Sequence, residues 1–388
     1  MRLLISAGEA SGESYGALLI AALKQREPSL DCFGVGGERM RDAGCRLVVD
    51  AKDIAVVGLA EVVTRLPKIR GEFRKLLRAV DSGKPDAAVL IDFPDWNLRL
   101  ARQLHRRGIP VIYYVSPQLW AWRPKRIAQI KRHVRKMLVI FPFEEAWYRE
   151  RGVEAEYVGH PLADLPAPGP APPLRSPQIP IAVLPGSRKK EITLNLPAML
   201  QAARTLGRKY QFIIPVASTV SSKWMVDLIH RAVGQDPGIN LKLESDARVV
   251  LSQARAAMVA SGTATVEAAL IGTPFVMVYR VSRLTWKLGR PLVSVPFFAM
   301  PNLIAGREVV PELVQDNFTP ENIVARMNEI IADGPARQSM LEGLKEVRAR
   351  LAAPSGAGSA SDRAAATVFE ALGSRLQASG FRLHVRSS

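Results

Sequence analysis

The sequence of 388 residues contains few cysteines, which disulfide-rich and many zinc-binding proteins need. It has 2 cysteines, Cys32 and Cys45, with neither a CxxC spacing nor a histidine cluster beside them. This pattern argues against a disulfide framework and a zinc site. Such sparse cysteine use also fits a reducing compartment.

Long apolar runs are missing as well. The N-terminal residues MRLLISAGEASG reach Gly8 and Glu9 sooner than a signal peptide would. The region 256–278 is apolar, but polar residues, a glycine and a proline interrupt it, which indicates strand, loop, helix and strand rather than a membrane span. We therefore expect a cytoplasmic protein that stays where it is made.

Acidic residues are scarce relative to basic ones. There are 36 Asp and Glu against 53 Lys and Arg, a net charge of +17. Nucleic acid, an anionic membrane face or a phosphorylated substrate would each complement this charge. A basic nucleic-acid-binding protein is the alternative that charge alone suggests. No nucleic-acid-binding module is recognisable, however, so we expect no nucleic-acid partner.

What is present is an alternation of short apolar runs with helical stretches, which occurs twice. Strands alternating with helices in this way predict a parallel sheet covered on both faces, and the length suits two such domains. The strands are expected at residues 2–7, 32–36, 87–91, 111–115 and 137–140, then at 181–184, 212–216, 257–260 and 275–278. The main helices are expected from residue 14, at 61–80 and 98–107, then at 191–207 and 263–271.

Prolines are concentrated between residues 161 and 180. Because proline fixes φ and lacks a backbone donor, this stretch is predicted to be a linker, neither helix nor central strand. The predicted organisation is thus a first domain at 1–160, the linker at 161–180, a second domain at 181–350 and a helical tail at 351–388. In doubly wound α/β domains facing across a cleft, ligands bind outside the carboxyl ends of the strands.

The first motif follows the first strand. Gly8 and Gly12 allow a ligand to approach the backbone closely. Glu9 and Glu13 would repel a diphosphate, so we expect Gly8, Glu9, Ser11, Gly12 and Glu13 to face a hydroxyl-bearing acceptor. The alternative is a plain strand-to-helix turn, which also favours glycine.

The second motif, IDFPDWN, ends a buried strand with two carboxylates, Asp92 and Asp95. Two such groups can serve as a general base and its orienting neighbour. The alternative is that Asp95 or Asn97 only caps the next helix. His160, at the predicted hinge, is assigned to the acceptor side, although a lone histidine is more often structural.

Two further motifs follow strands of the second domain. Gly186, Ser187 and Arg188 suit a phosphate at a helix start, with Arg188 neutralising a departing diphosphate, unless this is a solvated basic turn. The other motif comprises Ser261, Gly262, Thr263 and Glu267. Its small residues admit a nucleotide, and its carboxylate in an apolar helix suits ribose hydroxyls, unless the pattern is a helix cap.

Two basic stretches lie in the first domain. Basic residues with interfacial tryptophans suit an anionic bilayer surface, whereas the alternative is a solvated helix face. The stretches comprise Arg65, Lys68, Arg70, Arg74, Lys75 and Arg78, and then Arg123, Lys125, Arg126, Lys131, Arg132, Arg135 and Lys136 with Trp120 and Trp122.

The motifs occur together in one order, from the first strand to about Glu312. They are AGEASGE, FGVGGERM, IDFPDWN, YYVSPQLWAWRPKR, FPFE, VGHPLAD, LPGSRKKEI, ASGTATVEAAL and PNLIAGRE. This combination resembles the lipid-A-disaccharide synthase family. The resemblance implies a GT-B fold of two Rossmann-like domains. It also implies a peripheral enzyme of the inner membrane that joins UDP-2,3-diacylglucosamine to 2,3-diacylglucosamine 1-phosphate (lipid X), giving the β-1′,6-linked disaccharide 1-phosphate and UDP.

The same resemblance assigns roles to residues. It places UDP in the second domain, adds Asn302 to the UDP site, and makes Asp95 the candidate base of an inverting displacement. Trp96 and Glu13 depart from the family's usual Phe and Asp. No DxD motif is evident, so no metal and no cofactor beyond the UDP-sugar substrate are expected. The oligomeric state stays open, with a homodimer as one option, and another GT-B enzyme such as a UDP-N-acetylglucosamine 2-epimerase is the enzymatic alternative.

Overall fold

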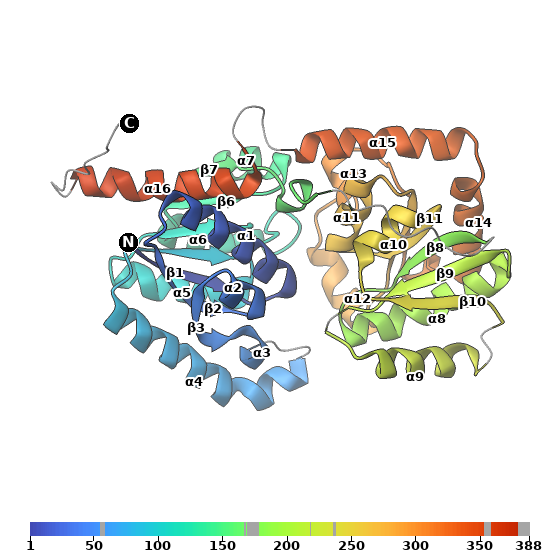
Figure 1. Ribbon diagram of the computed structural model, residues 1–388, viewed down its shortest axis with the longest axis horizontal. Helices are drawn as coiled ribbons and strands as arrows, with labels where there is room; N and C mark the ends of the chain where they lie inside the picture. The colour runs from blue at the N-terminus through green and yellow to red at the C-terminus, as the bar shows by residue number, and fades with distance from the viewer. Residues whose placement is uncertain are drawn as a thin grey trace. The chain divides into compact units, whose positions relative to one another are not determined.

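The computed structural model describes residues 1–54, 59–166, 168, 178–217, 219–235, 238–352 and 358–378. The chain divides into two compact units, shown in Figure 1. The first unit is Met1–Asp164 together with Leu351–Ser388, and the second is Leu165–Arg350.

The first unit is built on a seven-stranded sheet of order β3-β2-β1-β4-β5-β6-β7, in which every neighbouring pair is parallel. Its central strands are mostly apolar, and Leu3–Ile5 and residues 87–91 are completely buried. Helices therefore cover both faces. The strands are β1 (Arg2–Ala7), β2 (Asp31–Gly36), β3 (Cys45–Asp50), β4 (Ala87–Ile91), β5 (Val111–Tyr114), β6 (Lys136–Val139) and β7 (Ala155–Tyr157). The helices are α1 (Ala10–Arg26), α2 (Glu38–Asp42), α3 (Ala51–Ile54), α4 (Leu59–Gly83), α5 (Pro94–Arg106), α6 (Ile127–His133), α7 (Pro142–Arg149) and α16 (Ala360–Ala378), with 3-10 turns at Pro124–Arg126 and Pro161–Ala163.

The second unit contains a six-stranded parallel sheet of order β10-β9-β8-β11-β12-β13. The strands are β8 (Ile179–Leu184), β9 (Tyr210–Pro215), β10 (Asn240–Glu244), β11 (Ala256–Ala260), β12 (Phe275–Tyr279) and β13 (Glu312–Val314). The helices are α8 (Lys189–Leu206), α9 (Ser222–Val233), α10 (Ala247–Gln253), α11 (Thr263–Ile271), α12 (Arg283–Gly289), α13 (Met300–Ala305), α14 (Pro320–Ile331) and α15 (Pro335–Leu351), with 3-10 turns at Arg290–Leu292 and Gln315–Asn317.

Each sheet has a point where the strand order reverses. In the first unit this point lies between β1 and β4, and in the second between β8 and β11. In each sheet, the connections that leave the two flanking strands run to opposite faces of the sheet. They open a crevice at the carboxyl ends of those strands, which is the usual ligand site of such folds. All four of the main motifs directly follow these four strands.

The predicted strands and main helices are present, and β1, β4 and α11 have the predicted bounds. Four strands were missed. These are β3, β7, β10 and β13, which are the outermost strands of the two sheets. Edge strands are partly exposed, so their sequences lack the continuous apolar signal of central strands.

The prediction that residues 161–180 exclude helix and central strand is wrong at both ends. Pro161–Ala163 forms a 3-10 turn, and Pro180 lies in the central strand β8. Proline is tolerated there because it is near the start of the strand, where it pairs with Gln211 of β9 before pairing with β11 begins at Ile181. Residues 167 and 169–177 of the predicted linker lie outside the described residues.

The predicted helical tail at 351–388 contains helix α16, and the structure adds that this segment belongs to the first unit. Helix α16 packs against α1, and Ala364 and Ala365 of α16 are completely buried. Two polar contacts fasten it to β7. The Arg363 guanidinium donates to the Tyr157 carbonyl at 2.8 Å, and the Thr367 hydroxyl bonds the Glu156 carboxylate at 3.1 Å.

Candidate active site

The turn between β4 and α5 holds an unusual backbone. Asp92 and Phe93 are consecutive residues with left-handed φ angles of 46° and 51°. Non-glycine residues adopt this conformation at a cost, and only where surrounding contacts hold them there. The Asp92 carbonyl accepts hydrogen bonds from Asn97 Nδ2 at 2.8 Å and from the Tyr113 hydroxyl at 2.6 Å, which provides that support.

Asn97 ties this turn to the end of β1. Its Nδ2 also donates to the Ile91 carbonyl at 3.1 Å, while its Oδ1 accepts from the Ser6 hydroxyl at 2.8 Å. A side chain at Gly8 would overlap the ring of Phe93, so glycine lets the two loops pack together. The structure thus brings the first two motifs into contact, as their positions at the switch point predict.

Asp95 lies in the first turn of α5 and is exposed. Its carboxylate pairs with Arg126 at 2.5 Å and lies 3.8 Å from Arg123, with 67% of the side chain exposed. The capping alternative is excluded, because Phe93 is the N-cap residue and no side chain caps this helix. Asp95 is therefore an accessible carboxylate held in place by arginine.

Two residues assigned to the acceptor side have structural roles. Glu13 accepts a hydrogen bond of 2.9 Å from the Arg39 amide, and thereby stabilises the first turn of α2. His160 is 1% exposed, packs edge-on to Tyr15, and accepts at Nδ1 from the Leu162 amide at 3.2 Å. Burial lowers the pKa of His160 to about 3, which keeps the ring neutral. These contacts give both side chains a structural role, and their assignment to the acceptor side stays a prediction.

Among the other residues of the first motif, Gly8 and Glu9 form the turn after β1, while Ser11 and Gly12 lie in the first turn of α1. Gly8 and Gly12 are buried, whereas Glu9 and Ser11 are partly exposed. Glu9 is the N-cap residue of α1, and its carbonyl accepts from the Glu13 amide at 2.7 Å. In the first motif, the two glycines are therefore buried, and the side chains of Glu9 and Ser11 lie at the surface.

Glu191 is the side chain that sequence reasoning missed in the second unit. Gly186 has a φ of 124°, and a side chain there would overlap the Glu191 carboxylate. That carboxylate accepts from the Ser187 amide at 3.0 Å and from the Arg188 amide, and burial raises its pKa. A glutamate three residues after the N-cap is a recognisable capping signal that could have identified it.

This arrangement changes the predicted phosphate contacts. The backbone N–H of Ser187 already has a partner in Glu191, so it is not available as the predicted phosphate donor. Ser187 and Arg188 are both exposed at the start of α8, an 18-residue helix whose N-terminus attracts anions.

The β11 motif opens helix α11. Gly262 is the N-cap residue with a φ of 133°, a value suited to glycine, and its surroundings leave open space. The Ser261 hydroxyl donates to the Phe298 carbonyl at 3.0 Å, while Thr263 is exposed. Neither Thr263 nor Glu267 caps the helix, so the capping alternative is wrong. Burial raises the pKa of Glu267, and the nearby Arg248 opposes that rise.

Asn302 has no capacity left for a nucleotide. The side chain is completely buried, and its Nδ2 donates to the Val310 carbonyl at 2.9 Å and to Glu312 at 2.8 Å. Its Oδ1 accepts from the amides of Val309 and Val310, at 2.8 and 2.9 Å. An asparagine side chain offers two donor hydrogens and two acceptor sites, and all four are used. Asn302 therefore holds the α13 loop, and its assignment to direct UDP contact is not supported.

Comparison with known proteins decides the family. The lipid-A-disaccharide synthetase profile matches residues 3–355. The chain belongs to this family. It is 56% identical to the lipid-A-disaccharide synthase of Koribacter versatilis, over 95% of this chain and 98% of that one. It is 44% identical to the synthase of Myxococcus xanthus, over 96% and 97% of the two chains.

Membership of the lipid-A-disaccharide synthetase family confirms the predicted activity class, a hexosyltransferase of lipid A synthesis. The epimerase and nucleic-acid alternatives are thereby set aside. Solved structures confirm the GT-B fold. The MnaA–UDP complex of S. aureus matches with a TM-score of 0.63 at 13% identity, covering 96% of this chain and 97% of that one. The calicheamicin glycosyltransferase CalG4 matches with a TM-score of 0.60 at 18% identity, covering 96% and 98%.

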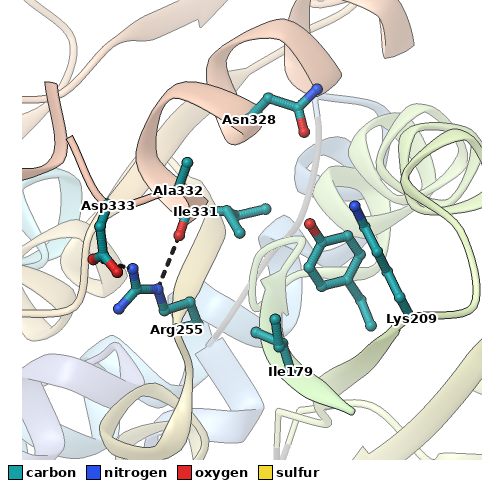
Figure 2. Close-up of a pocket in the computed structure, with 8 residues that line it drawn as sticks. Ile179, Lys209, Arg255, Asn328, Ile331, Ala332 and Asp333 are labelled. Carbon is teal, nitrogen blue, oxygen red and sulfur yellow. Dashed lines mark hydrogen bonds and ion pairs between the residues drawn. The ribbon is translucent and has the colours of Figure 1, made fainter.

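A surface pocket of about 660 Å³ lies elsewhere in the second unit (Figure 2). Ile179 and Tyr210, which line it, begin β8 and β9, so it lies at the amino ends of the strands, opposite the motif loops. Its Arg255 is already bonded to the Ile331 carbonyl at 2.9 Å and to Asp333. We therefore assign no substrate to it.

The two basic stretches of the first unit, which the sequence suggests as membrane patches, expose fewer tryptophans and free charges than expected. Trp120 is buried and donates to Glu144 at 2.9 Å, whereas Trp122 is 39% exposed with Arg123 over its ring. Lys68 pairs with Asp53 at 2.7 Å, so its charge is partly neutralised. In the described residues, no helix is both long enough and apolar enough to span a bilayer.

Glu144 in the FPFE motif is a further residue whose role the sequence did not reveal. It is 1% exposed and accepts from the Ser116 hydroxyl at 2.9 Å and the Phe141 amide at 3.1 Å, besides Trp120. Burial raises its pKa to about 7. This carboxyl fastens the segment after β5 to the start of α7.

Proposed function

We propose that this protein transfers 2,3-diacylglucosamine from its UDP conjugate to the 6-hydroxyl of 2,3-diacylglucosamine 1-phosphate. The products are the β-1′,6-linked disaccharide 1-phosphate and UDP. The observation that carries the proposal is the position of the four motifs. They follow the two strands that flank each switch point, and the family match names the reaction class.

In this proposal the second unit binds the donor. The start of α8 and the guanidinium of Arg188 neutralise the diphosphate, and the stabilisation grows as UDP departs. Gly262 and Ser261 let the nucleotide approach the backbone, while Glu267 accepts from ribose hydroxyls. Burial raises the pKa of Glu267, because it disfavours the charged carboxylate. Hydrogen bonds from the ribose hydroxyls would offset this cost when substrate binds.

The first unit supplies the acceptor side. Asp95 takes the proton of the attacking hydroxyl, and the oxygen then displaces UDP from the opposite face of the anomeric carbon, with inversion. Arg126 and Arg123 both approach Oδ1 of Asp95, and this pairing orients the carboxylate. The supported turn at Asp92 fixes the backbone from which Asp95 projects.

The proposal includes no metal and no cofactor, because Arg188 and the start of α8 already provide positive charge. It also includes binding to the anionic surface of the inner membrane through the first unit, supported by Trp122 and Arg123. A homodimer remains one option for the assembled enzyme.

The test is to incubate the purified chain with synthetic donor and acceptor and to detect UDP and the disaccharide by mass spectrometry. The variant Asp95→Asn should lower kcat by about 10²–10⁴-fold with UDP affinity unchanged. The matched control is Asp81→Asn, another exposed aspartate paired with an arginine, at 2.7 Å from Arg107, which should keep wild-type turnover. Near-normal turnover of Asp95→Asn would remove Asp95 as the base.

A further inference from the structure

Among the described residues, exposed large apolar side chains are concentrated in the second unit, on α12 and the 3-10 turn after it. Figure 1 labels α12. Leu284, Leu288 and Leu292 are 69%, 65% and 60% exposed. The other exposed large apolar residues of the described chain are scattered, and none exceeds 42%. Clustered exposed leucines mark an interaction surface, whereas single ones need no explanation.

The charged residues within the segment that carries these leucines are all positive. Arg283, Lys287 and Arg290 alternate with them and are exposed. The sequence contains no aspartate or glutamate from residue 281 to residue 307. An apolar face bordered by cations is complementary to a bilayer with anionic headgroups.

The segment is also anchored to its own unit. Trp286, on the same helix, packs at 5.8 Å against Phe298, which in turn stacks on Tyr279 at 5.7 Å. The Ser282 hydroxyl accepts from the Thr285 amide at 3.2 Å and caps the helix. The leucines thus remain exposed although the helix has an inward-facing tryptophan that fixes it.

We propose that Arg283–Leu292 is a membrane-docking surface, whose leucines enter the interface of an anionic phospholipid bilayer while Arg283, Lys287 and Arg290 contact the headgroups. The surface lies beside the donor site, because the Phe298 carbonyl accepts from the Ser261 hydroxyl. It is distinct from the first-unit patches. The proposal rests on the proposed function only in that both substrates are lipids.

The test is cosedimentation of the full chain with vesicles, without substrate. One set contains phosphatidylethanolamine with phosphatidylglycerol, and the other contains phosphatidylcholine alone. The wild type should bind the anionic vesicles better, with binding that weakens as salt rises. The variant Leu284→Ser/Leu288→Ser/Leu292→Ser should lose about tenfold in binding.

Two controls test whether this loss of vesicle binding is specific to the three leucines and is not caused by unfolding. Leu341→Ser replaces an exposed leucine on α15 of the same unit and should bind as the wild type does. An unchanged melting temperature and unchanged UDP affinity of the triple variant show that it is folded. Its turnover with substrates dispersed in detergent should match the wild type, which separates this proposal from the proposed function.

Three results would overturn the docking surface. The triple variant could bind anionic vesicles as tightly as the wild type, with Trp122→Ser being the variant that loses binding. Light scattering could show a wild-type dimer that the triple variant abolishes with vesicle binding intact, which would make the leucines a contact between copies. The triple variant could also lose turnover in detergent while it keeps vesicle binding, which would place the leucines in substrate binding.

Discussion

The carboxylate of Glu191 lies against the backbone of the loop that precedes it, where it accepts a hydrogen bond of 3.0 Å from the Ser187 amide. The contact closes the turn after β8 around Gly186, whose missing side chain leaves the space that the carboxylate occupies. The shape of the proposed diphosphate site thus depends on a residue that the phosphate itself does not need to touch.

Replacing Gly186 with alanine should therefore weaken UDP binding. The methyl group would overlap Glu191, and a φ of 124° is unfavourable for alanine. We expect the Kd for UDP, measured by calorimetry, to rise about tenfold or more. The control Gly207→Ala places alanine at a φ of 91° in open space at the other end of α8. It should cost stability and leave the Kd unchanged, and equal UDP affinity of both variants would refute the role of the loop.

Asn302→Ala should destabilise the protein. It removes a completely buried side chain and leaves two backbone amides, a carbonyl and the Glu312 carboxylate without that partner. We expect a loss of about 2–4 kcal/mol in the free energy of unfolding, seen as a lower Tm in calorimetry. The control Asn328→Ala, at an exposed position of α14, should melt within the error of the wild type. A variant with normal Tm and lost UDP affinity would restore the assignment of Asn302 to direct nucleotide contact.

The buried carboxyl of Glu144 predicts a pH dependence of stability. Its pKa rises from 4.5 to about 7 on folding, because burial disfavours the charged form. The folded protein thus holds this proton more tightly than the unfolded chain. The corresponding stability is complete below about pH 4.5, falls as pH rises to about 7, and then stays level.

The variant Glu144→Gln lacks this titration. Relative to it, the wild type should lose about 3 kcal/mol of unfolding free energy between pH 4.5 and 7, measured by denaturant titration. Glu150→Gln, at an exposed carboxylate after the same helix, should show no such trend. A difference between wild type and Glu144→Gln that stays constant over this window would mean that Glu144 does not titrate there.

Helix α16 should contribute to the stability of the first unit. Ala365 is completely buried in that helix, so Ala365→Glu inserts both volume and charge. We expect a loss of about 3 kcal/mol or more and a lower Tm. Glu370→Ala, at an exposed position of α16, should change stability by less than about 0.5 kcal/mol. An unchanged Tm for Ala365→Glu would show that α16 is dispensable for the fold.

The proposed charge neutralisation by Arg188 and α8 predicts turnover without a divalent ion. Activity of the purified chain should be the same with and without a strong chelator, as measured by UDP release. A loss of activity in chelator that magnesium or manganese restores, but calcium does not, would contradict the proposal.

Much of the fold was predictable because its signals are local. Central strands such as β4 and β11 are apolar along their length, and glycines at Gly8 and Gly186 mark the turns that follow strands. A parallel sheet then brings those turns to one edge, so the motif loops could be placed before any coordinates were known. The edge strands were not predictable in this way, since they are partly exposed and lack the continuous apolar signal. The position of α16 was not predictable either, since its partners α1 and β7 are distant in the chain.

The sequence by itself determined the order of strands and helices, the switch-point motifs and the family, since each depends on residue types and spacing along the chain. Only the tertiary structure decided which polar groups remain accessible. Asn302 and His160 look as available as Asp95 in the sequence, but buried partners engage the first two and leave Asp95 exposed. The physical reason is that hydrogen-bonding capacity is used up by neighbours in space, and burial shifts a pKa according to surroundings that spacing along the chain does not record.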